Sequence, residues 1–82
     1  MELKDTIEMM TSADYHERFR AEYHQLHIRY RKLENMIYKW TRGELEFTPT
    51  CPKSTYDLQL EFMKNYLAVL EARAIMEGVS LV

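Results

Sequence analysis

Apolar side chains recur at alternating spacings of four and three residues along the first half of the chain. The positions are Phe19, Tyr23, Leu26, Tyr30, Leu33, Ile37 and Trp40. This spacing keeps all of these side chains on one face of an α-helix, where they form a heptad seam. Aromatic rings at both ends of the seam indicate that the face is buried. We therefore predict a long helix over residues 14–41 that packs against a second apolar surface.

A second long helix is predicted over residues 53–77, and it carries two apolar stripes. One stripe is a heptad seam that matches the seam of the preceding helix: Tyr56, Leu60, Met63, Leu67, Leu70 and Ala74. The other stripe lies further round the helix: Phe62, Tyr66, Val69 and Met76. A helix that is apolar over much of its circumference belongs in the middle of a bundle, which two helices alone do not provide. We therefore predict a homo-oligomer, a closed dimer or a ring of dimers.

Capping and helix-breaking residues set the boundaries of these elements. Asp14 and Glu17 have the spacing of a capping box, which starts the first long helix. Gly43 and Gly78 are placed to adopt the left-handed conformation that ends a helix. The domain then divides into a short N-terminal amphipathic segment (1–13), a helical hairpin (14–78) with its loop at 42–52, and a C-terminal tail (79–82).

The predicted fold class is all-α. Two long antiparallel helices form a helical hairpin, a short N-terminal helix precedes them, and copies of the chain assemble into a homo-oligomeric bundle. Within the loop, Leu45 and Phe47 alternate with polar residues and are expected to fold back over the closed end of the hairpin.

The composition agrees with a single small helical domain. The chain has 82 residues, of which 46% are apolar and only two each are Gly and Pro. Cys51 is the only cysteine, so no internal disulfide can form, as is typical of a reducing compartment. No stretch approaches the roughly 18 uninterrupted apolar residues of a membrane span. A cytoplasmic protein without membrane partners is therefore expected.

The sequence offers little for catalysis or metal binding. It contains no glycine-rich phosphate loop, no paired carboxylates and no cofactor motif. Cys51 lies in a turn and no base partner for it can be identified. His24 and His27 have the spacing of a metal pair, but zinc usually needs four clustered ligands, so solvated histidines are favoured. We predict neither an enzyme nor a cofactor-binding or metal-binding protein.

The first long helix is basic and rich in tyrosine. Residues 15–42 contain seven Arg or Lys and three Glu. Cations beside flat rings suit phosphates and stacked bases. However, Tyr23 and Tyr30 belong to the buried seam, and exposed Arg and Lys are usually only solvated. In an oligomer, phosphate binding would be favoured over simple solvation of these side chains, because several basic helices brought together create a positive concavity.

Three runs of residues together resemble a known family. They are Glu17-Arg18 with Glu22-Tyr23-x-x-Leu26-x-x-Arg29-x-x-Lys32-Leu33-x-x-x-Ile37, then Phe47-Thr48-Pro49-Thr50-Cys51-Pro52, and then Gln59-x-x-x-Met63-x-x-Tyr66-x-x-x-Leu70-x-x-Arg73. This pattern, over about residues 14–78, is similar to the short helical-hairpin proteins of bacteriophages, the anti-CBASS and anti-Thoeris sponges for cyclic nucleotides.

The resemblance implies an immune-evasion protein of the host cytoplasm. Such a protein, most often a homohexamer and alternatively a dimer, binds cyclic di- or trinucleotides, or cyclic ADP-ribose variants, without cleaving them. The matched positions imply Arg18, Arg29, Lys32 and Arg73 as phosphate ligands and Tyr23 and Tyr66 as stacking platforms. The C-terminal β-rich segment of longer anti-Thoeris members has no counterpart here, which favours cyclic oligonucleotides.

Two other classes of function stay open at this point. One is a small oligomeric coiled-coil interaction module, whose second apolar stripe docks on a host protein. The other is binding to a DNA or RNA polymer through the basic helix. The net charge of −2 and the acidic first segment argue against a nucleic-acid polymer as partner.

Overall fold

The computed structural model describes all 82 residues, and its only regular elements are helices. A 3₁₀-helix η1 (Leu3–Thr6) leads directly into a one-turn helix α1 (Ile7–Met10). The long helices α2 (Tyr15–Thr41) and α3 (Lys53–Glu77) follow. The all-α prediction is confirmed.

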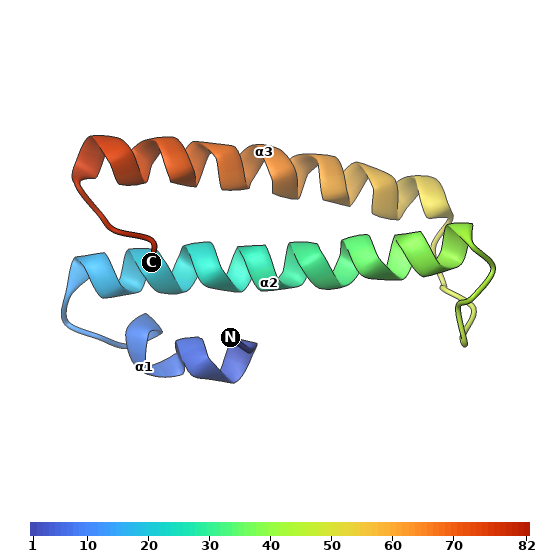
Figure 1. The fold of residues 1–82 in the computed structure, drawn as a ribbon, viewed down its shortest axis with the longest axis horizontal. Coiled ribbons are helices and arrows are strands. Elements are labelled where there is room, and N and C mark those ends of the chain that lie inside the picture. The colour runs from blue at the N-terminus through green and yellow to red at the C-terminus, as the bar shows by residue number, and fades with distance from the viewer.

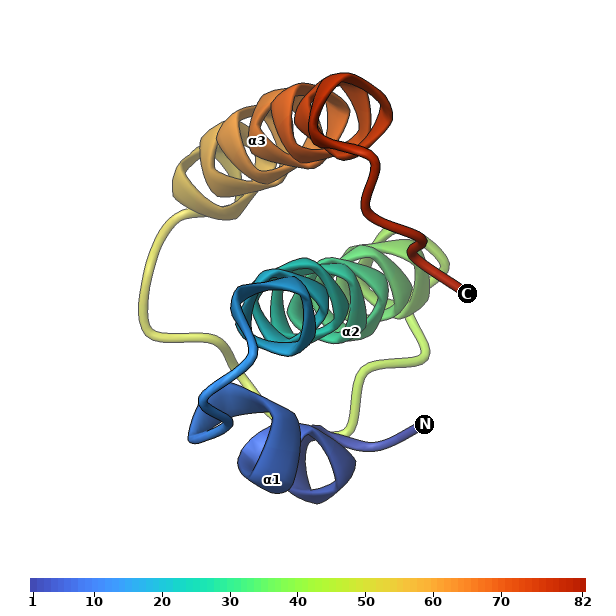
Figure 2. The same cartoon turned by 90° about the vertical axis from the view of Figure 1, so that its left-hand side faces the viewer.

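Helix α2 is the central element of the chain. It lies side by side with α3, and the two helices run in opposite directions (Figure 1). Seen along the helix axes, α3 covers one side of α2 and the segment of η1 and α1 covers another (Figure 2). The molecule is elongated, with extents of 43 × 24 × 18 Å. Within one chain, α2 and not α3 therefore occupies the middle.

The core lies where the two heptad seams meet. Phe19 of α2 is 2% exposed, and Leu70 of α3 is completely buried. Ala74 and Val79 complete this cluster, and Tyr23, Leu26 and Leu81 pack against it. Ile37 and Leu67 are buried further along the pair. The predicted seams are thus the faces that the helices bury, and burial of such side chains is worth about 1.5–3 kcal/mol each.

The helix ends follow from local hydrogen bonding. The side chain of Asp14 accepts a hydrogen bond of 2.9 Å from the amide of His16 and so caps α2. Gly43 adopts a left-handed φ of 72°, and the amide of Glu44 donates to the carbonyl of Lys39 at 2.9 Å. This is the Schellman arrangement that satisfies the last carbonyls of a helix.

Helix α3 ends in the same way. Gly78 has a φ of 69°, and the amide of Val79 donates to the carbonyl of Ala74 at 2.9 Å. Because Val79 and Ala74 are both buried, the cap also turns the tail inward, so that residues 79–82 run back along α2 (Figure 1).

The closed end of the helix pair is filled differently from the prediction. Phe47 is 58% exposed, so the expectation that it folds back over this end is wrong. Leu45 is half-buried. The rings of Trp40 and Tyr56 instead meet edge to face, with 6.0 Å between their centroids. These two large rings come from the helices themselves, whereas Leu45 and Phe47 line a depression beside Trp40.

The N-terminal segment packs on α2. Thr6 is completely buried, and Ala21 of α2 is 1% exposed. The side-chain amide of Gln25 donates to the Thr6 hydroxyl at 2.9 Å, and that hydroxyl donates to the backbone carbonyl of Leu3 at 2.7 Å. Helices this short do not persist alone in water, so packing on α2 stabilises them. No helix of the chain is both long and apolar enough to cross a lipid bilayer.

Candidate functional site

Two adjoining depressions follow the side of α2 that faces solvent. The first, of about 390 Å³, is lined by Met1, His24, His27, Ile28, Arg31 and Lys32. The second, of about 570 Å³, is lined by Arg31, Lys32, Glu34, Asn35 and Tyr38. Arg31 and Lys32 belong to both, so the depressions are continuous. We call the two together the basic groove.

The groove exists because polar side chains repeat with the period of the helix. His24, His27, Arg31, Asn35 and Tyr38 are spaced three, four, four and three residues apart, which places them on one face of α2. Met1 lines the first depression and the backbone of Leu81 lies beside His24, so both ends of the chain are close to this face. The side chains of the groove are therefore not covered by α3, and the chain termini flank them.

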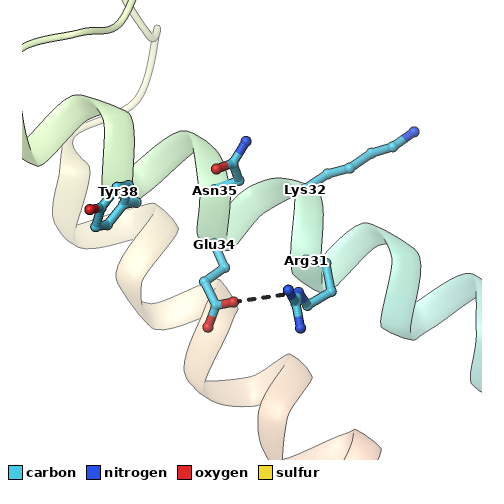
Figure 3. A pocket seen from close by; sticks show the side chains of 5 residues that line it. All are labelled: Arg31, Lys32, Glu34, Asn35 and Tyr38. Atoms are coloured by element: carbon cyan, nitrogen blue, oxygen red, sulfur yellow. Dashed lines mark ion pairs between the residues drawn. The ribbon is translucent and has the colours of Figure 1, made fainter.

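Lys32 is the free cation of the groove. Arg31 and Glu34 approach to 3.8 Å, with side chains 68% and 51% exposed, so their ion pair contributes little to stability. Lys32 forms no ion pair and extends away from that pair (Figure 3). A free ammonium group at the junction of two depressions is suited to an anionic ligand.

His24 and His27 are half-buried, so they are less exposed than freely solvated side chains would be. Burial lowers the pKa of His24 below its usual 6.5, and the neighbouring charge of His27 lowers it further. The backbone of Leu81 in the folded-back tail opposes this shift. His24 is consequently neutral near pH 7 and would gain a proton when an anion binds beside it.

Tyr23 holds the two histidines in place. Its ring is stacked on that of His27, with 5.9 Å between centroids and 9° between planes, and meets His24 edge on at 5.5 Å. The Tyr23 hydroxyl donates to Glu71 of α3 at 2.9 Å. Burial and then this hydrogen bond raise the pKa of Tyr23, so the phenol keeps its proton. One face of the ring is thus occupied by His27.

The six ligand residues implied by the resemblance lie apart in the single chain. Of these six, only Lys32 lines a depression. Arg18 donates to the carbonyl of Ser12 at 2.8 Å. Tyr66 donates to Glu22, which ties α3 to α2. Arg29 is exposed and has no hydrogen-bond or ion-pair partner.

Arg73 belongs to a closed polar cluster. Its Nε donates to Glu77 at 2.9 Å, and its Nη2 donates to the Tyr15 hydroxyl at 3.0 Å. Tyr15 in turn donates to Glu77 at 2.6 Å. The guanidinium also lies 5.0 Å from the centre of the Phe19 ring, in a cation–π contact. Arg73 is thus engaged within its own chain.

The sequence offers His24 and His27 only as a metal pair, and it gives no role to Arg31, Glu34 or Asn35, which also line the groove. The missing signal was the polar period of three, four, four and three residues between positions 24 and 38. That period is visible in the sequence. The folded-back tail, which helps to bury His24, is a tertiary feature that the period does not predict.

Comparison with known proteins places the chain in a family. Residues 13–76 match the family model named Sequestin, which covers α2, the connecting loop and α3 up to Met76. No curated protein and no solved structure is significantly similar to the chain. The family name indicates a binding role and agrees with the resemblance to phage sponge proteins. The match spans most of the sequence, and the chain therefore belongs to the Sequestin family.

Proposed function

We propose that this protein sequesters a small anionic signalling nucleotide and does not cleave it. The ligand is a cyclic di- or trinucleotide or, alternatively, a cyclic ADP-ribose variant. By removing this second messenger, the protein acts as a phage anti-defence protein in the host cytoplasm. The family name supports sequestration, and the unpaired Lys32 at the centre of the basic groove supports an anionic ligand.

Three further nitrogen-bearing side chains lie around Lys32. His24 and His27 line the groove on one side of it, and Arg31 adjoins it. Charge-assisted hydrogen bonds to phosphate are about twice as strong as neutral ones. The weak pairing of Arg31 with Glu34 leaves its guanidinium free to turn toward a phosphate. A phosphodiester ligand would satisfy these groups at little cost to the fold.

The far half of the groove supplies neutral polar groups. The Asn35 amide points out from α2 near Lys32 (Figure 3). An amide offers two donors and one acceptor, which suits the edge of a base. The Tyr38 hydroxyl accepts a hydrogen bond from Arg42 at 2.7 Å, and the Arg42 guanidinium lies 5.3 Å from the ring centre. Phosphate would therefore lie beside the histidines and a base beside Asn35.

Assembly completes the binding site in this proposal. Ligand sites usually enclose most of the ligand, whereas the basic groove is open and, Met1 apart, comes from one helix. A homo-oligomer, as a hexamer or a dimer, would cover the ligand with a second surface. Arg29 is exposed and unpaired, so it is available to a ligand held by a neighbouring copy. The other implied residues, Arg18, Tyr23, Tyr66 and Arg73, would first have to exchange their internal partners.

The test is calorimetry and thermal shift with a panel of cyclic dinucleotides, cyclic trinucleotides and cyclic ADP-ribose isomers. We expect saturable heat and a raised melting temperature with at least one compound. Mass spectrometry after denaturation should return that compound intact. The proposal would be refuted if no compound of the panel gave binding heat or raised the melting temperature. Recovery of a cleaved product would show that the protein is an enzyme.

A second candidate function is docking on a host protein. It is favoured by the exposed apolar side chains of α3, among them Phe62, Val69 and Met76. In that case the chain would be monomeric and would bind a host helix without responding to nucleotides. A stable homo-oligomer that buries these side chains would exclude this alternative.

A further inference from the structure

A row of nitrogen-bearing side chains extends beyond the basic groove along α2. Its members follow one another at spacings of four, three and four residues: Arg20, His24, His27 and Arg31. This spacing keeps them on one face of the helix. His24, His27 and Arg31 line the groove, whereas Arg20 lies one turn before its first residue. The row is therefore longer than the open part of the groove.

The C-terminal tail covers the beginning of this row. The guanidinium of Arg20 donates to the backbone carbonyl of Ser80 at 3.2 Å. The backbone of the next residue, Leu81, hydrogen-bonds to His24. The tail runs back along α2 at this point (Figure 1). Two consecutive residues of the tail thus contact two side chains that lie one turn apart on α2.

These contacts leave Arg20 and His24 without a counter-ion. Arg20 forms no ion pair. Burial, the charge of His27 and the charge of Arg20 lower the pKa of His24, and no carboxylate opposes them. A backbone carbonyl carries only a partial negative charge, whereas a phosphate oxygen carries more and forms a stronger hydrogen bond with a cation. A phosphate would therefore be a better partner for both side chains than the tail is.

The tail is anchored at its first residue and held weakly beyond it. Val79 is 6% exposed, and its amide donates to the carbonyl of Ala74 at 2.9 Å in the cap of α3. Ser80 and Val82 are exposed, and Leu81 is half-buried against the core. A single apolar side chain therefore holds residues 80–82 on α2, so this part can leave α2 while Val79 stays in place.

We propose that residues 80–82 form a strap over an anion subsite built by Arg20 and His24, and that a phosphate group displaces the strap when it binds there. The subsite continues the basic groove by one helical turn at the end where His24 lies. The natural occupant rests on the proposed function, because it would be a phosphate of the sequestered nucleotide. Inorganic pyrophosphate offers the same chemistry and serves as the probe.

The strap lowers the apparent affinity of the subsite. A ligand that binds only the open form binds more weakly in proportion to the fraction of molecules that are open. Partial burial of one leucine side chain favours the closed form by a factor on the order of ten. Opening the strap by mutation should therefore strengthen pyrophosphate binding by up to about tenfold.

The first test compares two neighbouring apolar residues of the tail. Leu81 packs against the core, whereas the side chain of Val82 is fully exposed. In calorimetry, Leu81→Ser should bind inorganic pyrophosphate about three- to tenfold more tightly than wild type, because it opens the strap. Val82→Ser should bind it as wild type does, and circular dichroism should show native helicity in both. Equal affinity of Leu81→Ser and wild type would overturn the proposal, as would a wild-type chain that does not bind pyrophosphate.

The second test assigns the subsite to Arg20. In the Leu81→Ser background the strap is already open, so a substitution of Arg20 reports only on the anion. There Arg20→Gln should weaken pyrophosphate binding about tenfold, through loss of one charge-assisted hydrogen bond. Lys64→Gln in the same background is the control, because Lys64 removes the same charge and lines no depression. Equal losses in the two variants would show nonspecific attraction and overturn the assignment.

The third test observes the strap itself. Nuclear magnetic resonance should show the amide signals of Ser80, Leu81 and Val82 moving to random-coil positions when pyrophosphate is added to the wild-type chain. The signal of Val79 should keep its folded position, because Val79 is anchored in the cap of α3. Pyrophosphate binding without movement of the three tail signals would overturn the proposal.

Failure of the strap and failure of the proposed function give different results. If pyrophosphate displaces the tail but no nucleotide of the panel binds, the strap stands and sequestration is refuted. If a nucleotide binds but neither Leu81→Ser nor Arg20→Gln changes pyrophosphate binding, sequestration stands and the strap is refuted.

Discussion

The ring of Tyr23 lies parallel to the ring of His27, with 5.9 Å between their centroids and 9° between their planes. Through this contact a residue of the core seam supports the wall of the basic groove. The Tyr23 hydroxyl extends in the other direction and donates to Glu71 of α3 at 2.9 Å. Packing of the helix pair and geometry of the groove are therefore coupled at Tyr23.

Replacing Tyr23 by Phe should separate these two roles. The ring and its stack on His27 persist, while the hydrogen bond to Glu71 is lost, so we expect the free energy of unfolding to fall by about 0.5–1.5 kcal/mol. Ligand affinity should change less than twofold. Urea denaturation measures the first quantity and calorimetry the second. Tyr56→Phe is the matched control, because the Tyr56 hydroxyl has no hydrogen-bond partner and Tyr56 lines no depression.

Periodicity was sufficient to predict which faces the two long helices bury. Phe19 and Leu70 were assigned to facing seams from spacing alone, and both are in the core. Spacing reports on one helix at a time, however, and the loop and groove depend on several elements. Phe47 is exposed, and Trp40 and Tyr56 contact each other at the closed end, a tertiary contact that no local pattern encodes.

The candidate site was less predictable for the same reason. Lys32 was identified from the family resemblance, and it lies in the groove. Arg73 was identified on the same basis, yet its guanidinium is held by Glu77 and Tyr15. Whether a surface arginine is free depends on which acids the fold brings beside it. His24 is expected in solvent from its polar surroundings in the sequence, because the local pattern does not show that the tail lies beside it.

Lys32→Gln should weaken binding of a nucleotide ligand about 10- to 100-fold. A direct charge-assisted hydrogen bond to a phosphate is worth roughly 1.5–3 kcal/mol, and glutamine keeps a polar, slightly shorter side chain without the charge. Stability should be unchanged, since Lys32 forms no ion pair. Lys64→Gln on α3 is the control, because Lys64 lines no depression. Equal affinity in wild type and Lys32→Gln would place the ligand elsewhere.

Binding should strengthen as the pH falls. The pKa of His24 is lowered in the free protein by burial and by His27, and a bound anion would raise it. Complex formation then takes up a proton, so affinity should increase below about pH 6.5 by up to about tenfold per pH unit. Calorimetry at several pH values measures this slope. His24→Gln should flatten it, whereas His16→Gln, outside the groove, should not.

Glu77 should make the fold sensitive to acid. Hydrogen bonds from Tyr15 and then from Arg73 lower the pKa of Glu77 below its usual 4.5. A carboxylate with a lowered pKa stabilises the folded state at pH values above 4.5, and this contribution is lost as the pH falls through the folded pKa. Urea midpoints of wild type and Glu77→Gln should therefore differ at pH 7 and converge near pH 3. A constant difference across this range would contradict the assignment.

Truncating two leucines of α3 should change two different properties of the protein, because the leucines lie on opposite faces of the helix. Leu70 is completely buried between α2 and α3, so Leu70→Ala should destabilise the fold by about 2–5 kcal/mol. A core of this size supplies only about 3–5 kcal/mol, so the variant should be largely unfolded at 37 °C. Leu58 is 51% exposed on the face of α3 that points away from α2, and Leu58→Ala should leave the urea midpoint of the monomer nearly unchanged while weakening the proposed homo-oligomer. Circular dichroism at low protein concentration isolates the first effect, and sedimentation at high concentration isolates the second. If Leu58→Ala instead lowered monomer stability as much as Leu70→Ala, the face of α3 that points away from α2 would be part of the core and could not contact a second copy.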